Sequence, residues 1–103
     1  MQFIEKIFEE AFLFKSSLFS DQRGEFNKIF NLLEIDNLKF QFPVKQINHS
    51  INFYKGTFRG FHYQNPPFAE KKIVYCIKGR IKDFIIDIRK DSSSFLKHYE
   101  IEL

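Results

Sequence analysis

The chain has 103 residues, which suits one domain rather than two, and its 44% hydrophobic and 28% charged residues are typical of a globular protein. The net charge of +3 is too small to indicate nucleic acid as a partner, although it suits a small anionic ligand. No apolar run is long enough to cross a bilayer, and the first residues do not resemble a signal peptide. We therefore expect a cytoplasmic protein without a membrane partner.

The N-terminal stretch, residues 3–12, allows two interpretations. Its apolar residues recur at the spacing i, i+3, i+4, which favours an amphipathic helix. The run Ala11–Phe14 is apolar throughout and is equally typical of a buried strand. The local pattern leaves this choice open.

The rest of the chain alternates short strand-like segments with turn signals. Residues 20–24 have the composition of a turn, and residues 31–38 favour a short helix. The single cysteine, Cys76, cannot form an intrachain disulfide, and we expect it to be a small buried hydrophobic side chain. Many short strands between turns predict an all-β sandwich or barrel. The predicted strands are residues 25–30, 40–48 (with Pro43 at an edge or bulge), 57–64, 71–77, 81–89 and 95–103, with a tight hairpin at Lys78–Arg80 and a loop at 91–94.

The predicted strand at residues 57–64 is unusually polar, because it contains Arg59, His62 and Gln64. Buried polar groups need partners, so these side chains form either a satisfied core network or a functional site. In a regular strand, Arg59 and His62 face opposite sides. They line one cavity only if the strand is bulged, which Gly60 permits, or if one of them reaches a neighbouring subunit.

Motifs in a fixed order run along the chain: Asp21–Gly24, Gln46–Ser50, Arg59–Gln64, Lys72–Val74 and Asp83–Arg89. Their order and spacing resemble those of the dTDP-4-dehydrorhamnose 3,5-epimerase family. The resemblance implies a cupin-type jelly roll, with a single cupin domain over residues 1–103 that is incomplete at its C-terminus. It also implies a homodimer that exchanges strands, and an extended rather than helical N-terminal segment.

The resemblance further implies an isomerase that inverts C3 and C5 of dTDP-4-dehydro-6-deoxy-D-glucose, next to its C4 ketone, in dTDP-L-rhamnose biosynthesis. Such a reaction needs a base, a cation or donor at the carbonyl oxygen, and an acid on the opposite face. His62 matches the family's base, and Lys72 matches the residue at the developing oxyanion. The family's catalytic tyrosine, and the aspartate that orients the histidine, belong to a part that this chain lacks.

The same resemblance assigns the substrate-binding residues. Arg23 and Arg59 match positions that hold the diphosphate, for which the guanidinium fork is well suited. Gln46 and Asn48 match positions that contact the nucleoside, and Phe26 matches an aromatic residue near the thymine.

Two positions depart from the family's pattern: Lys28 stands where many relatives carry glutamate, and Glu70 replaces a common glutamine. The histidines form no His-x-His pair, and there is no glycine-rich phosphate loop or nicotinamide fingerprint, so we expect neither a metal nor a cofactor. Two alternative functions stay open. One is a catalytically impaired fragment that binds nucleotide sugars, and the other is a sister 3-epimerase or 5-epimerase.

Overall fold

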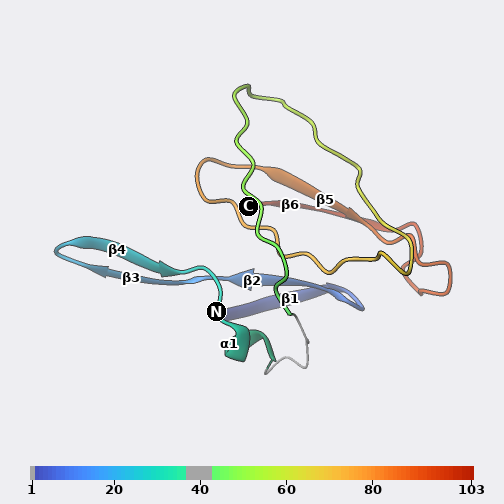
Figure 1. The fold of residues 1–103 in the computed structure, drawn as a ribbon, viewed down its shortest axis with the longest axis horizontal. Helices are drawn as coiled ribbons and strands as arrows, with labels where there is room; N and C mark the ends of the chain where they lie inside the picture. Colours follow the sequence, from blue (N-terminus) through green and yellow to red (C-terminus); the bar gives the residue numbers. More distant parts are fainter. Residues whose placement is uncertain (1, 37–42) are drawn as a thin grey trace.

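The computed structural model describes residues 2–36 and 43–103, and this part of the chain is nearly all β (Figure 1). Its strands form three separate antiparallel hairpins, with a short helix after the second. The all-β prediction is therefore confirmed at this level. The elements are β1 (Gln2–Phe8), β2 (Ala11–Lys15), β3 (Ser17–Asp21), β4 (Gly24–Lys28), α1 (Leu32–Asp36), β5 (Lys82–Ile86) and β6 (His98–Glu102).

The N-terminal segment is extended, as the resemblance implied, and forms the β1–β2 hairpin. Its pairing register shifts twice, between Phe3 and Glu5 and again between Lys6 and Phe8. Each bulge adds a residue and shifts the inside–outside alternation of the strand. The apolar residues of β1 therefore lose the two-residue period of a strand, which explains why their spacing imitates a helix.

The β3–β4 hairpin, called the arm below, projects away from the rest of the molecule (Figure 1). Its strands pair up to Asp21 and Gly24, which confirms the turn predicted at residues 20–24. Gly24 has φ of +131°, a conformation that favours glycine. Phe19 and Phe26 face each other across the arm with ring centroids 6.5 Å apart, and both rings are largely exposed.

The helix α1 confirms the short helix predicted after residue 30, although residues 37 and 38 of that prediction lie outside the described residues. Asn31 caps it, because its Oδ1 accepts hydrogen bonds from two backbone N–H groups of the first turn, at 3.0 and 3.4 Å. Its Nδ2 donates to Glu34 Oε1 at 3.1 Å, and Lys28 Nζ lies 2.9 Å from the same oxygen. Ile35 of this helix is the buried apolar side chain of the described residues.

The β5–β6 hairpin confirms the strands predicted near residues 81–89 and 95–103, in shorter form. Beyond β5, the Asp87 network closes the loop between the two strands; we use this name for Asp87, Arg89, Ser92 and Ser94. The buried Asp87 carboxylate accepts hydrogen bonds from Arg89 Nε (2.9 Å) and Nη2 (2.8 Å). It also accepts from the hydroxyls of Ser92 (2.6 Å) and Ser94 (2.5 Å). These bonds, above all that from Arg89, hold the pKa of Asp87 well below its ordinary value.

Side-chain contacts join hairpins that share no sheet. Arg89 Nη1 donates to Glu10 Oε2, in the β1–β2 turn, at 2.9 Å. The Tyr99 hydroxyl on β6 donates to Glu5 on β1, and this bond raises the pKa of Tyr99. At the base of the arm, Asn27 Nδ2 donates to the Tyr75 hydroxyl at 2.6 Å. Polar contacts thus tie the β1–β2 and β5–β6 hairpins together, and tie the arm to Tyr75 outside the hairpins.

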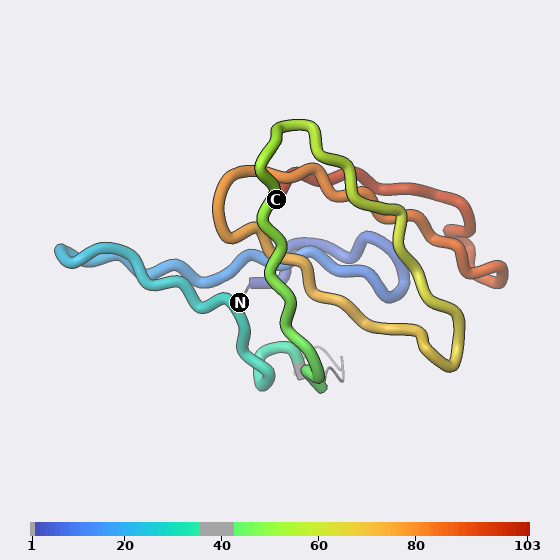
Figure 2. Tube along the Cα trace, turned by 45° about the horizontal axis from the view of Figure 1, so that its top comes forward, coloured from blue at the N-terminus to red at the C-terminus, as the bar shows by residue number. Residues whose placement is uncertain are grey.

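Residues 43–80, called the loop segment below, run as a long open excursion between α1 and β5 (Figures 1 and 2). The strands predicted at 57–64 and 71–77 are wrong, and so is the part of the 40–48 strand that is described, from residue 43 on. A strand exists only where a neighbouring backbone completes its hydrogen bonds. The described hairpins pair only within themselves, so these strand-like sequences have no partner.

Two smaller predictions in this region also fail. The hairpin expected at Lys78–Arg80 does not form, because β5 pairs with β6 rather than with residues 71–77. Cys76 is half-buried rather than buried, since the backbone around it is exposed, and its Sγ donates to the Lys78 carbonyl oxygen at 3.7 Å.

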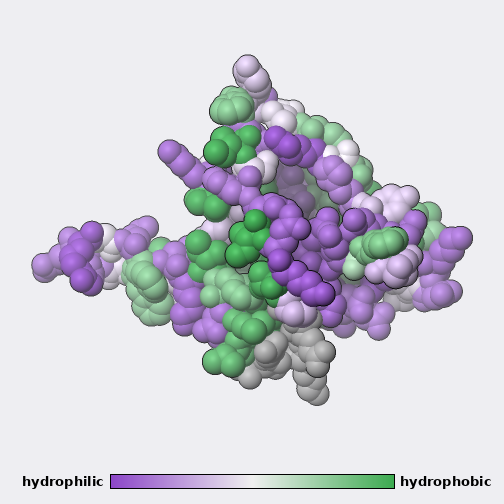
Figure 3. Space-filling model, in the orientation of Figure 1, coloured by the Kyte–Doolittle hydropathy of each residue, from purple (hydrophilic) through white to green (hydrophobic). Residues whose placement is uncertain are grey.

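The molecule is open for its length. Its radius of gyration is 15.4 Å, whereas a globular domain of this size has about 13 Å. Figure 3 shows apolar side chains gathered on the visible face around α1 and beside it. Large hydrophobic residues of the arm and the loop segment are also exposed. Extended apolar surfaces of this kind are typical of faces that other protein elements cover.

Candidate functional site

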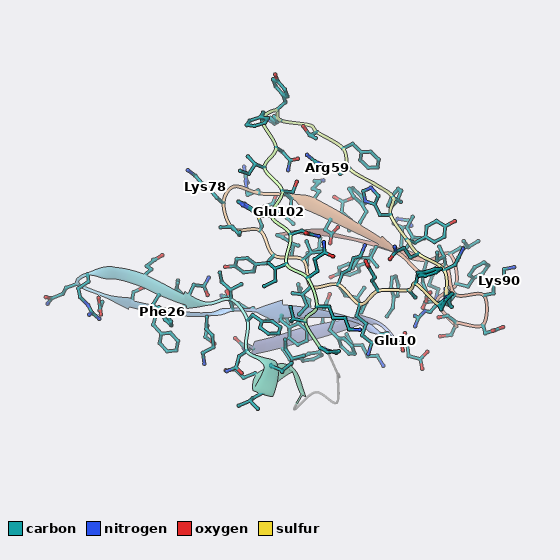
Figure 4. The ribbon with its side chains drawn as sticks, in the orientation of Figure 1. Glu10, Phe26, Arg59, Lys78, Lys90 and Glu102 are labelled. Atoms are coloured by element: carbon teal, nitrogen blue, oxygen red, sulfur yellow. The ribbon has the colours of Figure 1, made fainter. Side chains whose placement is uncertain are left out.

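The candidate site residues lie in two parts of the structure. Arg23 and Phe26 belong to the arm, whereas Gln46, Asn48, Arg59, His62 and Lys72 belong to the loop segment. Phe26 and Arg59 are well separated in Figure 4. Within the described residues, Gln46 and Asn48 are the only candidates joined to each other by a hydrogen bond, 2.9 Å from Gln46 Nε2 to Asn48 Oδ1.

Arg23 sits at the turn of the arm, and its side chain is 90% exposed. The Asp21 carboxylate accepts a hydrogen bond from the backbone N–H of Arg23 at 2.8 Å and another from Arg23 Nη2 at 2.6 Å. This pairing lowers the pKa of Asp21 and raises that of Arg23. Arg23 is therefore a charged group at the tip of a projecting hairpin, with one side of its guanidinium held by the turn.

Arg59 donates from Nε to Asn52 Oδ1 at 2.7 Å. This bond fixes the base of the guanidinium, and its two terminal nitrogens make no hydrogen bond to the described residues. A guanidinium held in this way presents paired N–H donors, the arrangement that grips phosphate oxygens. The geometry suits the predicted diphosphate role.

His62 is exposed and makes no hydrogen bond to the described part of the chain. Just before it, the rings of Phe58 and Phe61 pack edge to face with centroids 5.8 Å apart. Because this stretch is not a regular strand, strict alternation does not separate Arg59 from His62. Gly60 between them has φ of +141°, so the chain bends where the sequence placed its point of deformation.

Lys72 Nζ lies 3.5 Å from Glu70 Oε2, and both side chains are 54% exposed. An ammonium group has three donors, so this ion pair leaves others for a ligand oxygen. Glu70 is therefore the charged neighbour of the predicted oxyanion residue.

Sequence reasoning missed the partners of these groups: Asp21, Asn52 and Glu70. Two of them, Asp21 and Glu70, stand two positions from the cation they bind, a spacing that allows pairing in a turn. Asn52 is seven positions from Arg59 and carries no such signal. No group of three His, Cys, Asp or Glu side chains within residues 2–36 and 43–103 could hold a metal ion.

Comparison with known proteins connects these residues to one family. The sequence profile of dTDP-4-dehydrorhamnose 3,5-epimerase matches residues 5–103. A protein of that name from Shigella flexneri is 37% identical over 100% of this chain and 57% of its own length. Its namesake from Escherichia coli K12 is 34% identical over 94% of the chain and 52% of its own length. A dTDP-4-dehydro-6-deoxyglucose 3-epimerase from Streptomyces is 32% identical over 74% of the chain. No solved structure matches significantly.

The chain is thus a β-rich protein whose polar motifs follow those of a sugar-nucleotide epimerase. It belongs to the dTDP-4-dehydrorhamnose 3,5-epimerase family. The chain spans about half the length of the curated relatives it matches. None of the described helices is long and apolar enough to cross a membrane.

Proposed function

We propose that this chain carries the base and the oxyanion-stabilising residue of an epimerase that inverts C3 and C5 of dTDP-4-dehydro-6-deoxy-D-glucose. The observation that carries this proposal is the family match over residues 5–103, which includes His62 and Lys72. A cytoplasmic location and a role in dTDP-L-rhamnose biosynthesis belong to the same proposal. The substrate is the partner it requires, with no cofactor.

The chemistry follows from the two side chains. His62 accepts the proton from the carbon next to the C4 ketone, and neutral imidazole is a suitable base near neutral pH. The electron pair moves into the enolate, whose oxygen bears negative charge that the Lys72 ammonium stabilises. A proton returned to the opposite face completes the inversion. The resemblance to the family implies a tyrosine as the acid for that step.

Arg23, Phe26, Gln46, Asn48 and Arg59 hold the nucleotide in this proposal. The five side chains are exposed or partly exposed, and the arm places two of them away from the others (Figure 4). A strand-exchanged homodimer with a cupin jelly roll in each subunit would let the arm of one subunit reach the loop segment of its partner. The exposed aromatic rings of the arm and the apolar residues of the loop segment support such an arrangement.

A second candidate function is supported by the Streptomyces 3-epimerase, which matches most of the chain. This relative supports a reaction at C3 alone, with the same base and oxyanion residue. A third candidate is a nucleotide-sugar-binding chain that turns over poorly. The chain spans about half the length of the curated relatives, and a chain without a positioned proton donor would react roughly 10²–10⁴-fold more slowly.

Incubation with dTDP-4-dehydro-6-deoxy-D-glucose in heavy water tests these candidates. Deuterium at both C3 and C5 supports the 3,5-epimerase, and deuterium at C3 alone supports the 3-epimerase. Binding without exchange supports the third candidate. We expect His62→Ala to abolish exchange while the protein stays folded, since His62 is exposed and makes no hydrogen bond to residues 2–36 or 43–103. Unchanged exchange in that variant would refute the assignment of His62 as the base.

A further inference from the structure

Gln64 and Glu70 are two polar residues near His62 and Lys72 to which the proposed function gives no role. They face each other across the Pro66–Pro67 turn, which the Phe68 N–H closes on the Asn65 carbonyl oxygen at 2.9 Å. The turn therefore brings the end of the His62 stretch next to the start of the Lys72 stretch.

One carboxylate bridges these two stretches. The Gln64 amide, oriented with its nitrogen towards acceptors, donates to Glu70 Oε1 and Oε2, each at 3.2 Å, and to the Phe68 carbonyl oxygen at 2.9 Å. Glu70 Oε2 in turn lies 3.5 Å from Lys72 Nζ. The chain Gln64–Glu70–Lys72 is thus a continuous polar connection.

We propose that Glu70, held by Gln64, is the positioning residue for Lys72; this inference rests on the proposed function. A lysine side chain has four rotatable bonds, and an exposed ammonium samples many directions unless a partner restrains it. An exposed ion pair adds little to the free energy of folding. Its effect here is instead on direction, because the carboxylate holds the ammonium on one side and leaves donors on the other side for a ligand oxygen.

A glutamine at position 70 could also offer an oxygen to Lys72. Glutamate differs because it accepts from Gln64 with both oxygens and pairs with Lys72 by charge. A carboxylate next to the ammonium also competes with the enolate oxygen for the same donors. Glu70 therefore restrains Lys72 more firmly than glutamine would, while it lowers the net positive charge that the enolate meets.

The experiment compares Glu70→Ala, Glu70→Gln and Gln64→Ala with the unaltered chain. The first readout is the rate at which acetic anhydride modifies Lys72, measured by mass spectrometry with Lys78 as internal reference. The second is deuterium exchange into the substrate, resolved into kcat and KM. Glu100→Ala is the matched control, since it removes an ion pair of similar exposure, that with Lys82 at 2.5 Å, outside the proposed site.

We expect Glu70→Ala to increase the modification of Lys72 about threefold or more, and to lower kcat by roughly 10- to 100-fold with little change in KM. Glu70→Gln should restore most of the rate. Gln64→Ala should act in the same direction, and combining it with Glu70→Ala should add nothing further, because both act through one connection. The control should change neither readout.

Two results would contradict this inference about Glu70 without contradicting the proposed function. Unchanged modification of Lys72 in Glu70→Ala would show that the carboxylate does not restrain the ammonium. Faster modification with unchanged exchange would show that the restraint does not serve the reaction. The absence of exchange in the unaltered chain would instead refute the proposed function, and the catalytic part of this inference with it.

Discussion

The Asp87 network and the loop segment differ in how their polar groups are satisfied. Every oxygen of the buried Asp87 carboxylate accepts hydrogen bonds, and the network lies beside a paired hairpin. Along the loop segment, by contrast, the backbone is exposed and two strand-like stretches have no partner among the described residues. Yet five of the seven candidate site residues belong to the loop segment. The part that carries most of the candidate site residues is therefore the part with fewer local stabilising interactions.

This difference has a physical origin. The Asp87 network is local, since its members lie within eight consecutive residues and their contacts cost little loop-closure entropy. The strand-like sequences of the loop segment need distant partners to complete their hydrogen bonds. A functional site built on such strands depends on tertiary or intersubunit contacts that the local sequence does not supply.

The largest effect we expect is in amide hydrogen exchange. The paired amides of β5 and β6 should exchange at least about a hundredfold more slowly than those of residues 43–80 in the isolated chain, because exposed and unpaired amides need no opening step. Mass spectrometry of peptic fragments measures this. Equal protection of both regions would contradict the comparison, as it would show that the loop segment is paired in solution.

Arg59→Ala should weaken binding of dTDP by roughly 10- to 100-fold, since a hydrogen bond to a charged group contributes about 1.5–3 kcal/mol. Isothermal titration calorimetry measures the affinity. Arg80→Ala is the control, because Arg80 is an exposed arginine paired with Glu102 at 3.7 Å, away from the proposed site. An affinity equal to that of the unaltered chain would refute the phosphate role of Arg59.

Asp87→Ala should lower the midpoint of thermal unfolding by roughly 10 °C, as it leaves Arg89, Ser92 and Ser94 without their shared acceptor. Circular dichroism follows the transition. His62→Ala serves as the contrast, and an exposed substitution of this kind should move the midpoint little. If both variants unfold at the same temperature, the Asp87 network is not the stabilising feature we describe.

A smaller effect should appear in the free energy of unfolding at acidic pH. The pKa of Asp87 is lower in the folded than in the unfolded state, so its contribution to the free energy of unfolding is complete above the unfolded pKa of about 4. That contribution is lost progressively as the pH falls further. Urea titrations between pH 7 and pH 2 should show the loss, and Asp87→Asn should show a weaker dependence over the same range. A parallel pH profile in both proteins would exclude this origin.

Local chemistry made part of the fold predictable. The turn before Gly24, the short helix after Asn31 and the strands around β5 and β6 follow from turn residues, capping and alternation. The bulges of β1 give its apolar residues a spacing that is typical of a helix, and only the family resemblance predicted the extended conformation. Residues 57–64 and 71–77 have strand composition, but composition does not supply a pairing partner.

The candidate site was predictable in its residue types but not in their partners. His62, Lys72 and Arg59 were identified from motifs, whereas the contacts of Arg59 with Asn52 and of Glu70 with Gln64 depend on backbone turns. The spacing of apolar residues likewise could not predict the Asp87 network, since polar side chains in a loop form it. Side-chain partners of this kind emerge only once the chain path is known.

The hydrogen bond from Asn27 to Tyr75 holds the base of the arm, and a small rotation at this point would move the tip of the arm. It lies at the base of β4, four residues from Arg23 at the tip, a strand length of about 13 Å. A rotation of the arm by about 10° about this hydrogen bond would displace the tip by about 2 Å. That displacement is enough to move a guanidinium out of hydrogen-bond range of a phosphate. Because Tyr75 stands three residues from Lys72, this one contact links the position of Arg23, the proposed phosphate-binding residue, to the stretch that carries the proposed oxyanion residue.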